Sequence, residues 1–469
     1  MANHLSPRHA ASGVRTYNAA YLLFALAVLA ICCLTAARLQ MSQCPDEAAR
    51  YLLPQFIYRN GQLPLGWEPE VRIESWGFSY AFMPYLPAIL SACLMRMASA
   101  LGAGDYGLLV AARLVSALCV AGAAFVACKL CEKVTGSQRA GMLGGIAVGC
   151  TPQVIFVGSY VNNDAMALLA VMIIVYAWAL GCLNNGTPDN SGPSTAWSPK
   201  TLVLMAIGMA LALLSYYNSY GFVLLCPVVF AANARRRKCS WACIIRGLAL
   251  VAVIAFLLAG WHFIRNIIIY QGDLFGMRMR REFTELYAID ELKPDVLSPR
   301  AKGLTLWETF VGRRWFVSTA ISFLCLTGCM DVFAPHWVYV VYAIAVVAGI
   351  AGCLSSWRDS RLGQTRPQIP TEMLFGLACA CAITISLSMW YTYATDFQAQ
   401  GRYIFGCMSA YALILACGFN HISRRLQSAR TCALIGRRID VCLVMSLVLI
   451  VLLVVCYFDC LGPCFLPRP

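Results

Sequence analysis

The chain has 469 residues, of which 60% are hydrophobic and only 12% are charged, and its mean hydropathy is +0.68. A soluble globular domain carries about 25% charged residues, so this composition excludes one and predicts a polytopic membrane protein. Backbone polar groups in lipid must be satisfied within the spanning segment, so we expect an all-α transmembrane bundle that forms a single domain over residues 1–469.

Apolar segments bounded by polar stretches predict a bundle of about 11 membrane-spanning helices, each near the ~20 residues that a span requires. These helices are expected near residues 17–38, 107–131, 140–161, 164–182, 201–218, 220–233, 241–264, 335–356, 372–391, 403–420 and 439–458.

The stretch 79–100 is also apolar, but it contains Pro84, Pro87 and Arg96. We therefore expect a juxtamembrane or re-entrant helix there. On this interpretation residues 40–106 form the first extracytoplasmic loop with its juxtamembrane helices, and residues 265–330 form a second, large extracytoplasmic segment.

Clusters of Lys and Arg between the predicted spans indicate the orientation. If 79–100 does not cross, all of them fall on one side, which the positive-inside rule identifies as the cytoplasm. The amino terminus is then cytoplasmic and the carboxyl terminus is outside. The formal charge of +14 lies on the cytoplasmic side and does not indicate a nucleic-acid partner. The clusters are Lys129/Lys133/Arg139, Arg235/Arg236/Arg237/Lys238, Arg358/Arg361/Arg366 and Arg424/Arg425/Arg430/Arg437/Arg438.

Three acidic residues gather on the predicted outer face. Asp46 and Glu47 follow the first span, and Asp164 follows the third, where capping of the next helix would be enough to explain it. Together the three carboxylates could supply a general base and the oxygen ligands of a divalent cation, Mg²⁺ or Mn²⁺, held by Glu47 and Asp164.

Arginines lie on the same face. Arg265 ends the seventh predicted helix and Arg402 begins the tenth, and each is either an interfacial anchor or a ligand for an anion. A further group in the outer segment either binds a phosphate or an anionic glycan, or pairs with the acids next to it. This group consists of Arg278, Arg280, Arg281, Arg313 and Arg314.

The 24 cysteines show no regular spacing, and most lie inside apolar runs where cysteine packs as a small hydrophobe. They predict neither a disulfide framework nor a zinc motif. Four of them are expected near the outer surface, and whether any of these form disulfides stays open. These four are Cys44, Cys456, Cys460 and Cys464.

Four motifs in order along the chain carry a family resemblance. The chain resembles the C-type (GT-C) membrane glycosyltransferases, most closely their bacterial branch of uncharacterised multi-pass membrane proteins. Ala48 and Arg50 stand where that branch usually has Pro and His. The motifs are Pro45-Asp46-Glu47, Gly158 to Asp164, Trp261/Arg265/Asn266 with Tyr270/Gly272/Asp273, and Gln400-Gly401-Arg402-Tyr403.

The resemblance implies transfer of a sugar from a polyprenyl-phosphate carrier to a cell-envelope glycan, lipid or protein on the outside of the bacterial plasma membrane. It implies Asp46 as the general base, with Glu47 and Asp164 positioning a cation or the acceptor. The arginines would neutralise the donor phosphate, and polar neighbours would bind substrate. The expected phosphate ligands are Arg265, Arg402, Arg313 and Arg314, and the expected substrate-binding residues are Asn163, Asn266, Gln400 and Tyr403.

Two other functions compete with this hypothesis. A transporter or a lipid-linked glycan flippase would also need many helices, but its ionisable residues would lie near the bilayer midplane, often in repeated halves. The charges here gather at the predicted helix ends, which favours the enzyme. A glycan-binding relative without activity is the third alternative.

Overall fold

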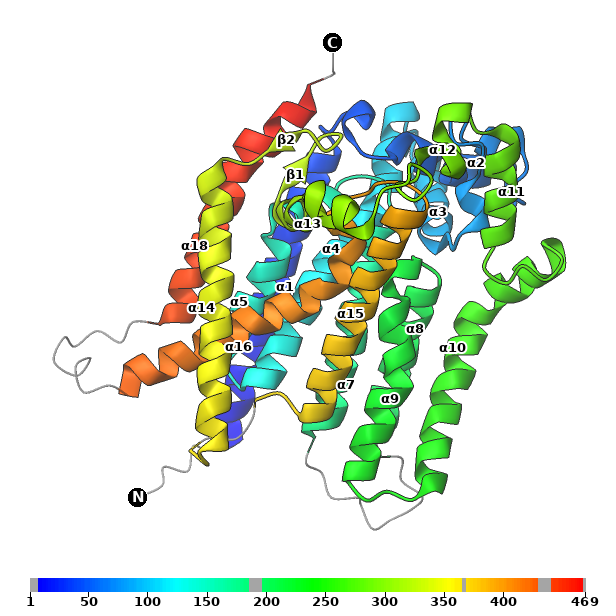
Figure 1. Ribbon diagram of the computed structural model, residues 1–469. Helices are drawn as coiled ribbons and strands as arrows, with labels where there is room; N and C mark the ends of the chain where they lie inside the picture. The colour runs from blue at the N-terminus through cyan, green and yellow to red at the C-terminus, as the bar shows by residue number, and fades with distance from the viewer. Residues whose placement is uncertain (1–6, 185–195, 365–367, 429–439, 467–469) are drawn as a thin grey trace.

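The computed structural model describes residues 7–184, 196–364, 368–428 and 440–466. This part of the chain is helical apart from the short antiparallel pair β1 (Leu326–Thr327) and β2 (Val332–Phe333) and one isolated bridge. The helices form one elongated bundle, in which the first helix starts at the lower end and the last helix finishes at the upper end (Figure 1).

Eight segments of the described chain are long and apolar enough to cross a membrane. Their helices closely match eight of the predicted spans, so the all-helical membrane bundle is confirmed. They are α1 (Pro7–Ala36), α4 (Asp105–Thr135), α7 (Asp164–Leu183), α10 (Trp241–Ile269), α14 (His336–Arg361), α15 (Thr371–Ala394), α16 (Met408–Ser428) and α18 (Val441–Cys456).

The other three predicted spans are helical but shorter. The segment 140–161 is divided into α5 (Gln138–Gly149) and α6 (Pro152–Val157), because Pro152 lacks a backbone N–H and starts a new helix. The remaining two are α8 (Pro199–Leu213) and α9 (Tyr220–Arg236). Eight candidate spans are therefore observed, and a total of eleven crossings stays a prediction.

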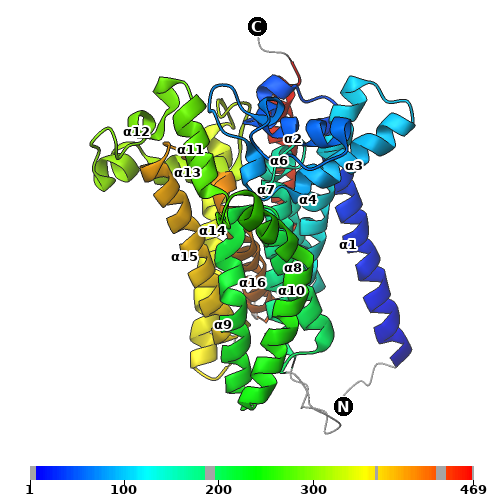
Figure 2. The same cartoon turned by 90° about the vertical axis from the view of Figure 1, so that its right-hand side faces the viewer.

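Short helices gather at the upper end of the bundle (Figures 1 and 2), which we call the loop end. The helix α3 lies there, as expected for a juxtamembrane helix, and its 15 residues rise only about 22 Å. The Tyr58 hydroxyl donates to Ser99 Oγ at 2.9 Å and fixes α3 to α2. The loop end comprises α2 (Glu47–Asn60), α3 (Leu86–Ala100), α11 (Met277–Tyr287), α12 (Pro294–Leu297) and α13 (Trp315–Leu324).

The basic clusters lie at the opposite end, at the α4–α5 turn and at the carboxyl ends of α9, α14 and α16 (Figure 1). One of them contains an ion pair, in which Arg425 Nη2 lies 2.5 Å from Asp359 Oδ1. The clusters therefore share one end, as the predicted orientation requires, while the side of the membrane that this end faces stays a prediction. Arg366, Arg430, Arg437 and Arg438 lie outside the described residues.

Close helix contacts build the centre of the bundle. The helices α14 and α16 cross at glycines, since a Cβ placed on Gly418 would lie only 2.1 Å from the Gly349 carbonyl oxygen. Such small residues allow membrane helices to approach through their backbones. The resulting rigid bundle supports the loop end, where the predicted site residues lie.

Candidate functional site

Asp46 and Arg402 form an ion pair at the loop end. Arg402 Nη2 donates to Asp46 Oδ2 at 2.5 Å, and the two residues are 356 positions apart in the sequence. The Asp46 side chain is 40% exposed, whereas that of Arg402 is 2% exposed. The Asp46 carboxylate is therefore partly accessible, and the Arg402 guanidinium that it contacts is buried.

Local backbone geometry places both partners. Asp46 precedes α2 in a left-handed conformation with φ of +60°, which ends the loop after α1 and starts the helix at Glu47. Arg402 is the second residue of the 3₁₀ segment η7 (Gly401–Cys407). A Cβ on Gly401 would lie 2.1 Å from the Phe323 backbone nitrogen, so a glycine is needed for this close backbone approach.

Further contacts orient the Arg402 guanidinium. Its Nε donates to Gln400 Oε1 at 2.6 Å, and its Nη1 donates to the Tyr160 hydroxyl at 3.3 Å. The Tyr403 hydroxyl lies 3.4 Å from Nη2. The Gln400 and Tyr403 side chains predicted to bind substrate thus lie next to Arg402, where they hold its planar group in one orientation.

Asp164 lies on the same centre. It is the first residue of α7, it is 1% exposed, and neither of its carboxylate oxygens has a hydrogen-bond partner. A small cavity is lined by Asp164 together with Arg402, Tyr216 and Tyr403. Buried carboxylates are normally hydrogen-bonded, so this unpartnered one, beside Arg402 and Tyr403, is a candidate functional group.

Arg50 is a residue of this centre that the sequence analysis did not select. It is 4% exposed, and its guanidinium lies 4.3 Å from the ring centre of Tyr80 and 5.6 Å from that of Tyr216. Burial alone would lower the pKa of Arg50, but Tyr80, Tyr216, Asp164 and Asp46 outweigh it and raise the pKa above its usual value. The sequence held one sign that this position is unusual, since Arg50 stands where the resembling branch usually has His.

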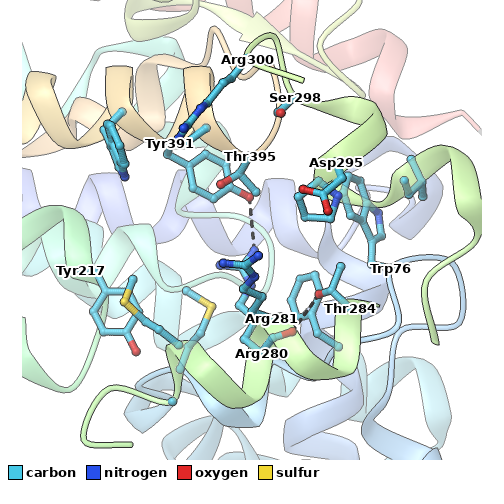
Figure 3. Close-up of a pocket in the computed structure, with 18 of the residues that line it drawn as sticks. Trp76, Tyr217, Arg280, Arg281, Thr284, Asp295, Ser298, Arg300, Tyr391 and Thr395 are labelled. Carbon is cyan, nitrogen blue, oxygen red and sulfur yellow. Dashed lines mark hydrogen bonds between the residues drawn. The ribbon is translucent and has the colours of Figure 1, made fainter. Parts of the chain in front are cut away.

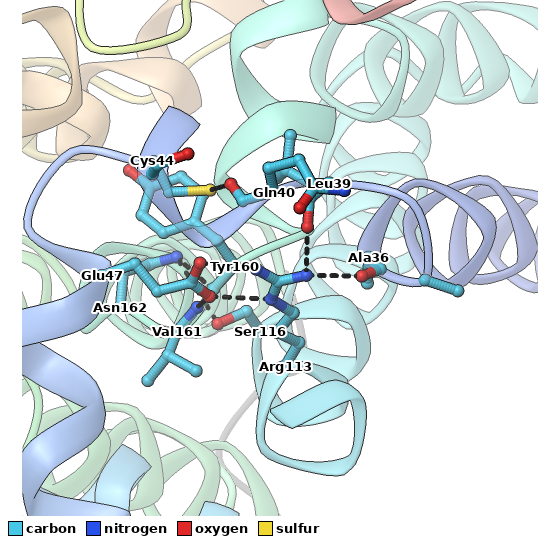
Figure 4. Close-up of polar contacts among 12 residues, drawn as sticks. Ala36, Leu39, Gln40, Cys44, Glu47, Arg113, Ser116, Tyr160, Val161 and Asn162 are labelled. Atoms are coloured by element: carbon cyan, nitrogen blue, oxygen red, sulfur yellow. Dashed lines mark hydrogen bonds and ion pairs between the residues drawn. The ribbon is translucent and has the colours of Figure 1, made fainter. Parts of the chain in front are cut away.

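Glu47 belongs to a different, closed network (Figure 4). Its carboxylate is fully buried and accepts from Arg113 Nε at 2.8 Å, from Arg113 Nη2 at 2.6 Å and from the Val161 N–H at 2.8 Å. Arg113 Nη1 also donates to the carbonyls of Ala36 and Leu39. This geometry is that of a structural anchor between α1, α2, α4 and the loop before α7.

The remaining predicted residues lie away from Asp46. Arg265 donates to the Pro64 carbonyl at 2.6 Å, and Arg313 and Arg314 are exposed at the start of α13. The Asn163 side-chain amide donates to the carbonyls of Pro84 and Ser215, and that of Asn266 donates to the Leu274 carbonyl. Both side chains therefore stabilise the local backbone. The cavities that contain Asp46, Asp164 or Arg402 include none of these five residues in their linings.

Two cavities meet beside the ion pair. One of about 350 Å³ contains Asp46, Tyr80 and Tyr403 in its wall. The other, of about 740 Å³, lies between α11, α12 and the end of α15 (Figure 3). Arg280 and Tyr391 line both cavities, together with Trp76 and Phe78. The two cavities are therefore neighbours with a shared wall, and Asp46 lines the smaller one.

Arg280 separates from the other arginines of its helix. Arg278 pairs with Glu282 and Arg281 pairs with Glu285. For these two arginines the structure therefore shows pairing with neighbouring acids, which was the second of the two predicted alternatives. Arg280 instead donates to the Tyr391 hydroxyl at 3.2 Å (Figure 3). Arg280 and Arg281 both line the larger cavity, but of the three arginines Arg280 alone also lines the smaller one, which the sequence alone did not say.

The predicted divalent cation fits this arrangement poorly. Both Glu47 oxygens already accept hydrogen bonds from Arg113 or Val161, and Asp46 is paired with Arg402. Among the described residues, the predicted carboxylates form no group of three ligand atoms close enough to share an ion. Arg113 already occupies the Glu47 carboxylate that would hold the ion together with Asp164, and the cation stays a prediction.

Comparison with protein families gives a match over residues 72–410, which is most of the chain, to the family described as "Predicted membrane protein (DUF2142)". The chain belongs to this family. No curated protein matches its sequence significantly. The family description supports an integral membrane protein and assigns no reaction.

Solved structures define the fold class. The chain is 14% identical to the oligosaccharyltransferase AglB from Archaeoglobus fulgidus in complex with an inhibitory peptide and a dolichol-phosphate, with a TM-score of 0.54 over 95% of this chain and 56% of that one. The apo form of the enzyme gives a TM-score of 0.52 over 94% of this chain and 55% of that one, again at 14% identity. The chain thus spans about half the length of these proteins. The fold resembles that of the GT-C glycosyltransferases.

The ion pair with Arg402 should make the stability of the protein depend on the ionisation of Asp46. Burial alone would raise the pKa of the Asp46 carboxyl, but Arg402 and Arg50 outweigh it, and the pKa lies below its usual value. Because the native pKa lies below the unfolded pKa of about 3.9, the ionised Asp46 carboxylate stabilises the folded protein at pH values above about 3.9. This stabilisation is lost as the pH falls through the native pKa.

We therefore expect the difference in thermal midpoint between the native protein and Asp46→Asn to be constant from pH 5 to pH 8 and to shrink below about pH 4. Thermal unfolding of both proteins in the same detergent across this range measures it. A difference that changes between pH 5 and pH 8 would show that Asp46 titrates near neutrality and is not held by Arg402.

Proposed function

We propose that this protein transfers a sugar from a polyprenyl-phosphate carrier to an acceptor hydroxyl at the loop end, with Asp46 as the general base. The observation that carries the proposal is that Asp46, which is paired with Arg402, lines a cavity that shares four wall residues with a second, larger one. The AglB-like fold supports it, because the solved AglB complex holds an inhibitory peptide and a dolichol-phosphate.

The donor phosphate is assigned to three guanidiniums near Asp46: those of Arg402 and Arg50, which are buried, and that of Arg280, which is half-buried and lines the smaller cavity. Arg402, Arg50 and Arg280 have few carboxylates to neutralise them, whereas Arg313 and Arg314 are exposed. Guanidinium groups bind phosphate oxygens through paired hydrogen bonds. Negative charge develops on the phosphate as its bond to the sugar breaks, so preorganised cations lower the barrier.

Proton transfer requires Asp46 to leave Arg402. While paired, the carboxylate is a weak base because its pKa is lowered. A donor phosphate that takes the place of Asp46 on Arg402 removes the nearest positive charge from the carboxylate and makes it more basic. The acceptor oxygen then bonds to the anomeric carbon, its proton moves to Asp46, and the phosphate leaves with the electron pair of the broken bond.

Asp164 is assigned the acceptor side of the reaction centre. Its carboxylate is buried, lacks a hydrogen-bond partner and lies on the small cavity with Arg402 and Tyr403. An incoming hydroxyl that donates to it would satisfy this group, which costs free energy while it is unpaired. Asp164 thereby orients the acceptor while Asp46 receives the proton.

Donor consumption tests the function. Purified protein in lipid nanodiscs is incubated with a panel of polyprenyl-phosphate sugars and soluble glycan acceptors, with EDTA, Mg²⁺ or Mn²⁺. Release of free polyprenyl phosphate from at least one donor is the expected result. Because guanidiniums neutralise the phosphate, EDTA is expected to have little effect. Movement of a labelled donor across proteoliposomes without breakdown would favour the flippase instead.

Replacing Arg402 by Lys is expected to lower kcat with the active donor by about 10²–10³-fold and to raise the donor KM, because Lys lacks the planar fork. The acceptor KM is expected to change little. Steady-state kinetics with each substrate varied in turn measure both effects. The matched control is Arg314→Lys, since that residue is exposed at the same end. A defect confined to the acceptor KM would remove the phosphate role.

A further inference from the structure

Three cysteines from two distant parts of the chain meet at the loop end, outside the site described above. Cys325 follows α13, Cys456 ends α18, and Cys460 lies in the π-helical turn Tyr457–Leu461. Their sulfur atoms all lie within 4.8 Å of one another, and all three residues are fully buried. Among the described residues, they form the one cluster of three Cys, His, Asp or Glu side chains with this spacing.

The thiols of this cluster differ from other buried cysteines. Cys226, for example, directs its sulfur to the Phe222 carbonyl one helical turn earlier. The sulfur atoms of Cys325, Cys456 and Cys460 instead lie next to one another. Three sulfurs directed at a common centre is the arrangement of a ligand set, and packing of small apolar side chains does not require it.

The backbone around the cluster is fixed from outside. The Tyr339 hydroxyl donates to the Cys325 carbonyl at 2.5 Å, and Thr327 Oγ1 donates to the Cys460 carbonyl at 2.9 Å. The Leu326 N–H donates to Gln153 Oε1 at 2.7 Å. These bonds hold the α13–β1 junction against the end of α18, so the three sulfurs are preorganised.

A second observation concerns Tyr342. This residue of α14 is fully buried, its hydroxyl has no hydrogen-bond partner, and Cys456 and Cys325 are among the titratable groups near it. A buried hydroxyl normally donates to an acceptor. A thiolate sulfur is an acceptor, and hydrogen bonds of this kind from a neighbouring group stabilise metal-bound thiolates.

We propose that Cys325, Cys456 and Cys460 bind one soft d¹⁰ cation, Zn²⁺ or Cu⁺, as thiolates. Metal–sulfur bonds of about 2.3 Å place neighbouring sulfurs about 4 Å apart, which the cluster reaches with little movement. Thiolates select these two ions among the available metals. Each thiol loses its proton to solvent on binding, so the complex carries a net charge of about −1 with Zn²⁺ and about −2 with Cu⁺.

The site would join the hairpin after α13 to the carboxyl end of α18. The helix α13 also contacts the segment that carries Arg402, because Ser322 Oγ accepts from the Gly401 N–H at 2.9 Å. The bound ion therefore has a structural role behind one wall of the candidate reaction centre. It is independent of the proposed sugar transfer.

Metal analysis of the full-length protein tests this proposal. Protein purified without chelators is expected to contain about one Zn or Cu per chain by inductively coupled plasma mass spectrometry, and the element found distinguishes the two ions. Cys460→Ser and Cys325→Ser are expected to lose at least about 90% of it, because removal of one of three ligands weakens binding strongly. Cys226→Ser is the matched control and is expected to retain it.

If the purified protein is metal-free, the reduced protein is titrated anaerobically with Zn²⁺, with Cu⁺ and with Co²⁺, whose thiolate charge-transfer absorption reports sulfur ligation directly. Binding of one equivalent with this absorption supports the site even where the serine variants fail to fold. Absence of binding after reduction, retention of metal by a folded Cys460→Ser, or a disulfide within the trio that persists in the native protein would overturn it.

Discussion

Replacing Asp46 with Asn is expected to reduce sugar transfer by about 10²–10⁴-fold while the chain stays folded in the membrane. The amide keeps the size of the side chain but cannot accept the acceptor proton, and it removes the negative partner of Arg402. Initial rates of donor consumption with the active polyprenyl-phosphate sugar measure the effect. Size-exclusion chromatography in detergent reports whether the variant is folded.

The control is Asp105→Asn, which makes the same chemical change at an exposed position of the loop end. It is expected to leave the rate within about twofold, since exposed surface substitutions rarely matter. Activity of Asp46→Asn equal to that of the control would remove the assigned base. An Asp46→Asn variant that binds donor at least as tightly as the native protein but fails to turn it over would support both the base and the displacement of Asp46 from Arg402 by the phosphate.

Replacing Arg113 with Met is expected to destabilise the protein by about 3–5 kcal/mol, because it leaves the Glu47 carboxylate buried without a counter-charge. Both side chains of this pair are completely inaccessible, and Arg113 also holds two backbone carbonyls at the end of α1. Equilibrium unfolding in detergent measures the change. Arg38→Met, at an exposed position near the same loop, is expected to change stability by less than about 0.5 kcal/mol.

The double variant Glu47→Gln with Arg113→Met is expected to recover part of the lost stability, since removal of both charges leaves no unpaired buried ion. This result would assign Glu47 to the scaffold. A protein in which Arg113→Met is as stable as the control, while Mg²⁺ restores activity lost in Glu47→Gln, would instead support the metal role predicted for Glu47.

The geometry of the motif after the first helix explains why its two acids separate. The sequence predicted both as catalytic because they are adjacent. The left-handed backbone at Asp46 starts a helix at Glu47, so the two side chains leave the chain in different directions. One carboxylate reaches the cavity with Arg402, and the other enters the interior with Arg113.

The amino-acid sequence by itself determined that this protein is an all-helical membrane bundle. It also determined the approximate bounds of the long helices and placed Asp46, Asp164 and Arg402 at one end of the bundle. Each of these depends on local properties, because a span follows from the apolar content of about 20 consecutive residues and a helix end from its neighbours.

Only the tertiary structure decided which charges neutralise one another. It paired Glu47 with Arg113, placed Arg50 against Tyr80 and Arg280 in the cavity wall, left Arg313 and Arg314 on the surface, and brought Cys325 next to Cys456 and Cys460. These partners are distant along the chain, and the free energy of each contact depends on how whole helices pack. No local pattern of residues encodes that packing, so these contacts became visible only in the assembled bundle.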